Sequence, residues 1–278
     1  MKNILKIMLM MITIFTIAGS AVYAAEIPVS DQDQLITSSD WTEISNLQDE
    51  MKKEEPDATI DYDKALKVYV DCNLIKLQTA DTKKLTSALE SANYVWVIPF
   101  KMEKTYGMFT VAKGLPLSEE AKSVLTKAEQ EEVKNHAGKW MITETAEHTV
   151  EPYYDTLLEK RETLSDCTRV VLVGSQPGMR QPVALGMDDE TARIWISLGY
   201  QYPVMEKIPE TQNVESGVYS FESVAEISDT YIEDSEVSTG AGVQSRSSMK
   251  YVAGIGIIVI GSILYCFFQL CPDTCHFS

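Results

Sequence analysis

The sequence predicts an α+β fold with a largely antiparallel sheet, helices on one face of that sheet, and one C-terminal transmembrane helix. In the middle of the chain, runs of alternating apolar residues are interleaved with runs at helical spacing, which is typical of this class. Near the C-terminus, the twenty residues 251–270 contain no charged side chain. We therefore expect a globular domain attached to a single membrane span.

The N-terminus has the layout of a secretory signal peptide over residues 1–24. Two lysines precede an apolar run over 7–17, and Val22 and Ala24 stand at positions −3 and −1 of a plausible cleavage site. The apolar run is too short for a typical span, although an uncleaved N-terminal anchor is the alternative. Either interpretation exports the chain. The Lys-, Ile- and Met-rich style of the segment favours a Gram-positive bacterial source.

Residues 251–270 are predicted to cross a membrane, because twenty helical residues at about 1.5 Å each cover the roughly 30 Å of a bilayer. A buried core helix is the alternative, but such helices are usually shorter and amphipathic. The signal peptide places the preceding domain outside and the tail 271–278 inside, in spite of Arg246 and Lys250 on the outer side. A loose glycolipid-attachment pattern at 238–242 leaves open whether the span is retained.

The exported part of the chain is strongly acidic. The whole sequence has a formal charge of −17, and residues 25–250 hold 22 basic and 40 acidic residues, a net charge of −18. Such a surface repels nucleic acid and anionic lipid, so neither is expected as a partner. A cationic partner or a loosely bound divalent ion would suit it better, and a well-solvated acidic surface is the simpler interpretation.

Two acidic segments are predicted to flank the globular part. Residues 25–60 form an N-terminal arm, loosely ordered apart from one short helix over 42–53. Residues 208–250 form a flexible stalk, because eight acidic residues and nine serines accompany Arg246 between 208 and 248. Low hydrophobicity with high net charge does not bury enough surface to offset the entropy of ordering.

Residues 61–207 are predicted to form the globular α+β ectodomain. Period-2 alternation from Leu66 to Cys72 indicates a strand, and spacing of three and four residues from Leu85 to Ala92 indicates a helix. Local signals then predict a helix cap at Asp81 or Thr82, a hairpin of 94–100 with 108–113, and helices beginning at Ser118 and at Thr126, the latter with Glu129 in a capping box.

The second half of the ectodomain has a similar order of elements. We expect a strand over 140–145, a helix opened by Pro152, an apolar central strand over 170–173, and a hairpin of 182–187 with 193–198. Strand–helix–strand–strand thus occurs at 65–113 and again at 140–198. This order of element types suggests a pseudo-duplication.

Two of the five cysteines, Cys72 and Cys167, belong to the ectodomain. In an oxidising compartment they are candidates for one disulfide, which would close a loop of about 95 residues and stabilise the fold by about 4 kcal/mol. Two separate buried thiols are the equally weighted alternative, because one pair is not a disulfide framework. The remaining cysteines lie in the span and tail, where they form no tetrahedral metal set.

No residue pattern identifies an active site. Ser175 follows Gly174 directly, whereas a nucleophile elbow places serine at the centre of Gly-x-Ser-x-Gly. The histidines His136 and His148 are candidate general bases, but nothing places either one near Ser175. We therefore nominate no catalytic, cofactor-binding or metal-binding residue, and expect no cofactor.

The sequence as a whole predicts a non-enzymatic binding or sensing module on the outer face of a cell membrane. We expect a protein partner at the surface or in the membrane, because the tail 271–278 is too short to transmit a signal alone. The alternative is a cell-envelope hydrolase acting on a wall polymer or peptide.

Overall fold

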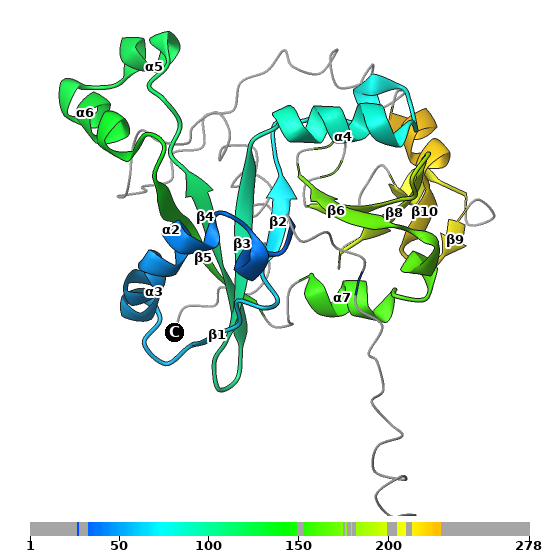
Figure 1. Cartoon of the computed structure of the whole chain (residues 1–278), viewed down its shortest axis with the longest axis horizontal. Helices are drawn as coiled ribbons and strands as arrows, with labels where there is room; N and C mark the ends of the chain where they lie inside the picture. The colour runs from blue at the N-terminus through cyan, green and yellow to red at the C-terminus, as the bar shows by residue number, and fades with distance from the viewer. Residues whose placement is uncertain are drawn as a thin grey trace, which may run out of the picture.

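The computed structural model describes residues 27, 33–148, 153–174, 176, 179, 182–198, 205–209 and 213–228. In these ranges the chain forms an α+β fold with a ten-stranded sheet in the order β5-β4-β3-β2-β6-β7-β8-β10-β9, and β1 pairs with β3 (Figure 1). Among the described strands, all pairs are antiparallel except β2 with β6. The predicted α+β class with a largely antiparallel sheet is confirmed.

The strands that the apolar patterns predict are present, with somewhat different ends. Both predicted hairpins form, since β3 pairs with β4 and β7 pairs with β8. The strands are β1 (Thr59–Ile60), β2 (Leu66–Tyr69), β3 (Tyr94–Lys101), β4 (Tyr106–Lys113), β5 (Trp140–His148), β6 (Arg169–Val173), β7 (Val183–Met187), β8 (Ala192–Ser197), β9 (Asn213–Glu215) and β10 (Val218–Ser220).

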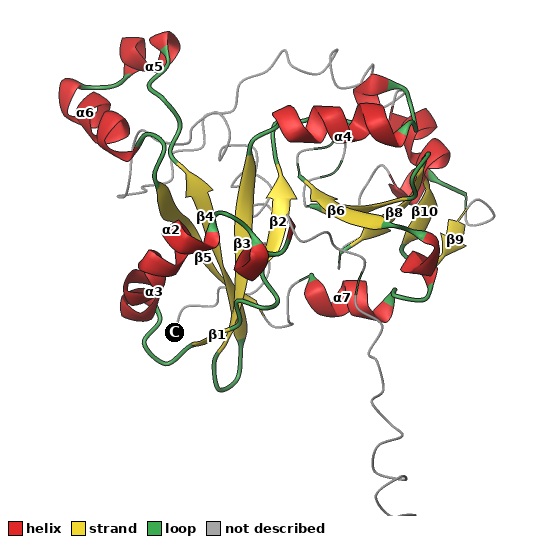
Figure 2. Cartoon of the chain, in the orientation of Figure 1, coloured by secondary structure: helices red, strands yellow, loops and turns green. Residues whose placement is uncertain are grey.

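Three of the described helices begin where a side chain accepts hydrogen bonds from the first backbone N–H groups. Asp81 caps α4 (Thr82–Ser91) by accepting from the N–H groups of Lys83 and Lys84, and Thr126 caps α6 (Lys127–His136) in the predicted capping box with Glu129. The other helices are α2 (Trp41–Ile44), α3 (Gln48–Glu54), α5 (Glu119–Val124) with Ser118 as its cap, and α7 (Tyr154–Glu159). Figure 2 shows α5 and α6 projecting from the sheet at one end of β4 and β5.

The helices pack on both faces of the sheet, so the prediction of helices on one face is wrong. One face, here called the α4 face, buries Tyr69, Val171 and Trp195 with Leu85 and Leu89 of α4. The opposite face, here called the α7 face, buries a second set of side chains against α7: Val68, Val170, Leu172 and Ile196 with Leu157. In Figure 1, α4 and α7 lie on opposite sides of β6. The central strands are apolar on both sides and therefore need cover on both.

The sheet topology does not repeat, so the suggested pseudo-duplication is not present in the described fold. In the first half, β2 and β3 flank α4 in the sequence and are neighbours in the sheet. In the second half, β5 and β6 flank α7 in the sequence but are separated in the sheet by β4, β3 and β2. The same succession of element types thus follows two different paths.

Residues 33–60, which belong to the segment predicted as a loosely ordered arm, are part of the packed fold. The predicted short helix over 42–53 is present as α2, a single 3₁₀ turn (Ser45–Leu47) and α3 in direct succession. Ile44 and Met51 are fully buried against Phe100 and Phe109 in a third apolar cluster, next to the α4 face. A few apolar side chains at helical spacing are sufficient to attach this acidic segment to β3 and β4.

Residues 213–228, predicted as the beginning of the stalk, also pack onto the sheet. They form β9, β10 and a helical segment over 221–228. Val218 and Val224 are fully buried, and the Phe221 ring stacks on Trp195 with 5.6 Å between ring centroids. The described fold therefore extends past residue 207 to residue 228.

None of the helices in the described ranges combines the length and the apolar character that a bilayer crossing requires. The predicted signal peptide (1–24), span (251–270) and tail (271–278) lie outside the described residues.

Candidate functional site

A small recess opens on the α4 face beside the single parallel strand pair of the described sheet, β2 with β6. Its volume is about 200 Å³. The lining side chains come from β2, β3, β6 and the end of α4: Lys67, Tyr69, Leu89, Glu90, Ala92, Tyr94 and Arg169. Because alternate residues of a strand share a face, Lys67 and Tyr69 of β2 point to the same side as Arg169 of β6.

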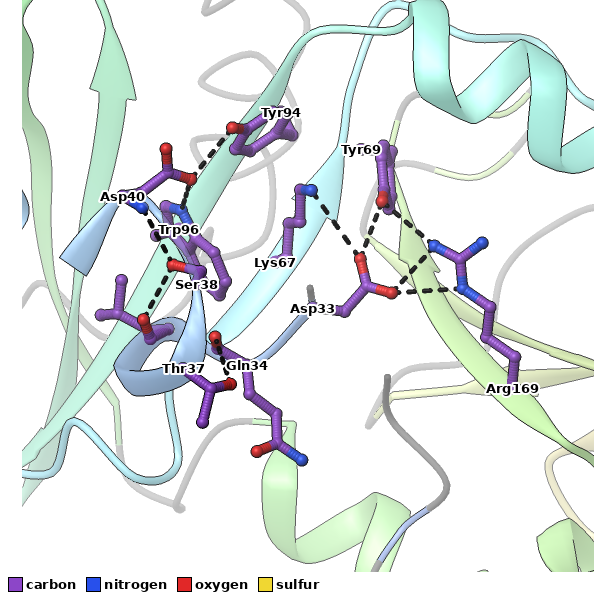
Figure 3. A network of polar contacts seen from close by, with 11 residues as sticks. Asp33, Gln34, Thr37, Ser38, Asp40, Lys67, Tyr69, Tyr94, Trp96 and Arg169 are labelled. Atoms are coloured by element: carbon purple, nitrogen blue, oxygen red, sulfur yellow. Dashed lines mark hydrogen bonds and ion pairs between the residues drawn. The ribbon is translucent and has the colours of Figure 1, made fainter. Parts of the chain in front are cut away.

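Asp33 lies at the centre of a polar network that includes Lys67, Tyr69 and Arg169 from the lining of the recess (Figure 3). Its side chain is almost completely buried. Tyr69 Oη donates to Asp33 Oδ1 at 2.7 Å, while Arg169 Nη2 and Nε donate to Asp33 Oδ2 at 2.8 and 3.2 Å. Arg169 Nη2 also lies 3.3 Å from Tyr69 Oη. These contacts connect the N-terminal segment to β2 and β6, the two strands that join the halves of the sheet.

Lys67 extends between two tyrosine rings in the same network. Its Nζ lies 3.9 Å from the centroid of the Tyr94 ring and 4.9 Å from that of Tyr69. Its ion pair with Asp33 Oδ1 is long, at 3.9 Å, and its side chain is 12% exposed. Burial lowers the pKa of the Lys67 ammonium, and the Asp33 carboxylate acts in the opposite direction. Burial and Asp33 together raise the pKa of Tyr69, which keeps that phenol protonated.

A second carboxylate, that of Asp40, holds the Tyr94 ring in place through the phenol oxygen. Asp40 Oδ2 accepts from Tyr94 Oη at 2.9 Å and from Trp96 Nε1 at 3.0 Å. Burial and the contact with Asp40 raise the pKa of the Tyr94 phenol. The backbone N–H of Asp40 in turn donates to Ser38 Oγ at 3.2 Å, so the N-terminal segment positions this carboxylate as well (Figure 3).

Two cationic groups of the network keep unused hydrogen-bond donors. Over the ranges that the structure describes, Lys67 Nζ has no hydrogen-bond partner, and Arg169 Nη1 has neither a hydrogen bond nor an ion pair. Both residues line the recess, and the Arg169 side chain is 21% exposed. The arrangement is therefore able to bind a negatively charged group.

The structure does not bring together His136 and His148, the two enzymatic candidates that lie among the described residues. His136 ends α6 before β5 begins, whereas His148 is the last residue of β5 and pairs with Tyr106. The nine residues of β5 separate them by roughly 30 Å at about 3.3 Å per residue. Ser175 lies outside the described residues.

In the structure, Cys72 and Cys167 are both free thiols. Cys72 follows the end of β2 and packs toward the α4 face, whereas Cys167 precedes β6 and belongs to the α7 face. Because Tyr69 is paired with Val173 in parallel register, the strands alone separate the two thiols by roughly 20 Å. A disulfide requires Cα atoms within about 7 Å.

We expect both thiols to be alkylated when the full chain is denatured without reductant and mapped by mass spectrometry. Denaturant is needed because burial, with a smaller effect of Asp71, raises the pKa of the Cys72 thiol to about 12. Burial also raises the pKa of Cys167. A peptide pair linked through Cys72 and Cys167 in the unreduced sample would contradict the register given above.

The sequence does not single out Asp33, Lys67 or Arg169 as site residues. Lys67 and Tyr69 occupy the polar positions of an alternating strand pattern, which predicts that their side chains are exposed to solvent. In the structure these positions lie on the α4 face, where neighbouring side chains cover most of their surface. Tyr69 is only 5% exposed. Asp33 carries no local signal at all, because its contacts join residues 36 and 136 positions apart in the chain.

Comparison with known proteins gives no further guide to this site. No protein-family model matches the chain, and neither a curated protein nor a solved structure matches it.

Proposed function

We propose that this protein is a membrane-tethered module that displays its acidic domain outside the cell and binds a ligand there. The observation that carries the binding role is the recess beside β2 and β6, where Lys67 and Arg169 present unused donors inside a chain of net charge −17. Desolvated cations are costly, so a recess that holds two of them with free donors is a candidate binding site.

A binding role is supported over turnover by the placement of the candidate catalytic groups. His136 lies before the first residue of β5, and His148 is the last residue of that strand. The two histidines are therefore too far apart to act on one substrate atom. The phenols of Tyr69 and Tyr94 have raised pKa values and both donate to carboxylates, which makes them poor bases. In the network they hold other side chains in place.

Display outside the cell rests on the two apolar segments of the sequence, 1–24 and 251–270. The proposed topology places residues 25–250 outside, the tail 271–278 inside, and a protein partner at the surface or beside the span. The acidic charge disfavours nucleic acid as that partner.

Protease treatment of intact cells tests this topology. We expect protease added to cells that produce the full chain, tagged after residue 278, to remove the domain and to leave a small tagged membrane fragment. A variant that lacks residues 1–24 is the control, and should stay intact until the cells are opened. Full protection of the domain in intact cells, or its recovery in the cytosolic fraction, would overturn the proposed display.

A further inference from the structure

We propose that the recess beside β2 and β6 binds the carboxylate group of a small monoanionic ligand. This inference rests on the proposed binding function and specifies the ligand class. Lys67 Nζ and Arg169 Nη1 are the two donors that would contact the carboxylate oxygens, because both residues line the recess and neither atom has a hydrogen-bond partner in the described part of the chain.

The two donors are held in place before any ligand arrives. Arg169 is fixed through Nε and Nη2, both of which donate to Asp33 Oδ2, so its remaining nitrogen Nη1 has a defined direction. Lys67 is held over the Tyr94 ring at 3.9 Å. Binding therefore loses little side-chain entropy, which favours affinity from a small number of contacts. Asp33 is a positioning residue here and does not contact the ligand.

The surrounding charges favour a monoanion over a dianion. Asp33 and Asp40 both interact electrostatically with the Lys67 ammonium. Their contacts with Arg169, Tyr69, Tyr94 and Trp96 occupy oxygens of both carboxylates. Glu90 adds a further carboxylate at the exposed rim. A ligand with one negative charge gains two charge-assisted hydrogen bonds, whereas a second negative charge would face these carboxylates.

The size of the recess limits the rest of the ligand to a short apolar group. Its volume is about 200 Å³, below the roughly 300 Å³ at which sites for drug-sized molecules begin. Leu89 and Ala92, at the end of α4, supply the apolar part of its lining. A short aliphatic acid, or the acidic end of a longer molecule, would place its carboxylate against the donors of Lys67 and Arg169 and its apolar part against Leu89 and Ala92.

Saturation-transfer NMR with the full chain in an uncharged detergent tests the inference, with propionate as the probe. Wild-type protein is expected to transfer saturation to propionate. Lys67→Gln should weaken binding about tenfold or more, as expected for the loss of a charge-assisted hydrogen bond. Lys101→Gln is the matched control, because Lys101 also stands over a tyrosine ring, that of Tyr106, but lies outside the recess. It should bind propionate as the wild type does.

A second variant keeps the test independent of the charged network. Ala92→Leu fills the recess from its apolar wall, leaves Lys67, Asp33 and Arg169 unchanged, and should also weaken propionate binding about tenfold. Propionamide, which has the same shape without the charge, should bind about tenfold more weakly than propionate.

Three results would overturn the carboxylate assignment. These are a wild-type protein that does not bind propionate, propionate binding that both Lys67→Gln and Ala92→Leu leave unchanged, and binding of propionamide or inorganic phosphate as tight as that of propionate. None of them bears on the protease experiment with intact cells, so failure of the ligand class and failure of the proposed display are distinguishable.

Discussion

Replacement of Asp33 by alanine is expected to lower the free energy of unfolding by about 3 kcal/mol or more, the usual cost of removing one partner of a buried ion pair. Asp33 is 2% exposed and accepts from Arg169 and Tyr69. Its removal leaves the Arg169 guanidinium and the Lys67 ammonium without their nearest counter-charge, at side-chain exposures of 21% and 12%. Urea denaturation of the full chain, followed by tryptophan fluorescence, measures the change without adding salt.

Asp155→Ala is the matched control for Asp33→Ala. Asp155 pairs with Lys64 at 3.3 Å, but its side chain is 45% exposed, so water replaces the lost partner. We expect a loss below about 1 kcal/mol for this variant. The double variant Asp33→Ala with Arg169→Met should recover part of the stability, because it removes the uncompensated cation as well. An Asp33→Ala protein as stable as Asp155→Ala would show that the network does not hold the N-terminal segment.

Replacement of Trp195 by alanine is expected to cost about 3–5 kcal/mol, the range for truncating a large buried aromatic side chain. Trp195 is fully buried at the centre of the α4 face, on β8. Its ring stacks on Phe221, with an angle of 14° between the ring planes. We expect the helical segment over 221–228 to lose its attachment first, and therefore to exchange backbone hydrogens faster than α4 does. Hydrogen exchange with mass spectrometry, together with urea denaturation, measures both effects.

Two further variants separate the packing of Trp195 from a general loss of aromatic residues. Trp195→Phe keeps an aromatic ring and removes an indole N–H that has no hydrogen-bond partner among the described residues, so it should cost clearly less than alanine. Trp41→Ala removes a partly exposed tryptophan whose ring contacts Tyr62 edge-on at 5.2 Å, and should also cost less. Equal exchange rates at 221–228 in Trp195→Ala and wild type would contradict the attachment described here.

The elements that the sequence predicted well are those whose signals are local. Asp81 accepts hydrogen bonds from N–H groups that lie two and three residues further along the chain. The capping box joins Thr126 to Glu129, three residues away. Both hairpins join strands that are adjacent in the chain. Such contacts follow from a few neighbouring side chains and do not depend on what packs against them.

The predictions that failed depend on contacts between distant parts of the chain. The acidic, polar composition of residues 33–60 and 213–228 predicted that both segments lie outside the core. In the structure Ile44 and Val218 are fully buried, because each packs against an apolar surface of the sheet. The sequence did contain one signal that helices cover both faces of the sheet. The apolar run over 170–173 does not alternate, and a strand of that kind needs helices on both faces.

The sequence by itself determined the α+β class, the hairpins, the starts of α4, α5 and α6, and the acidic charge, because each follows from composition or from residues a few positions apart. Tertiary structure alone decided the recess and its network. Asp33 meets Tyr69 and Arg169 only because β2 and β6 align in parallel and the N-terminal segment packs against them. The separation of Cys72 and Cys167 has the same origin, since the register of two strands sets which distant residues approach each other.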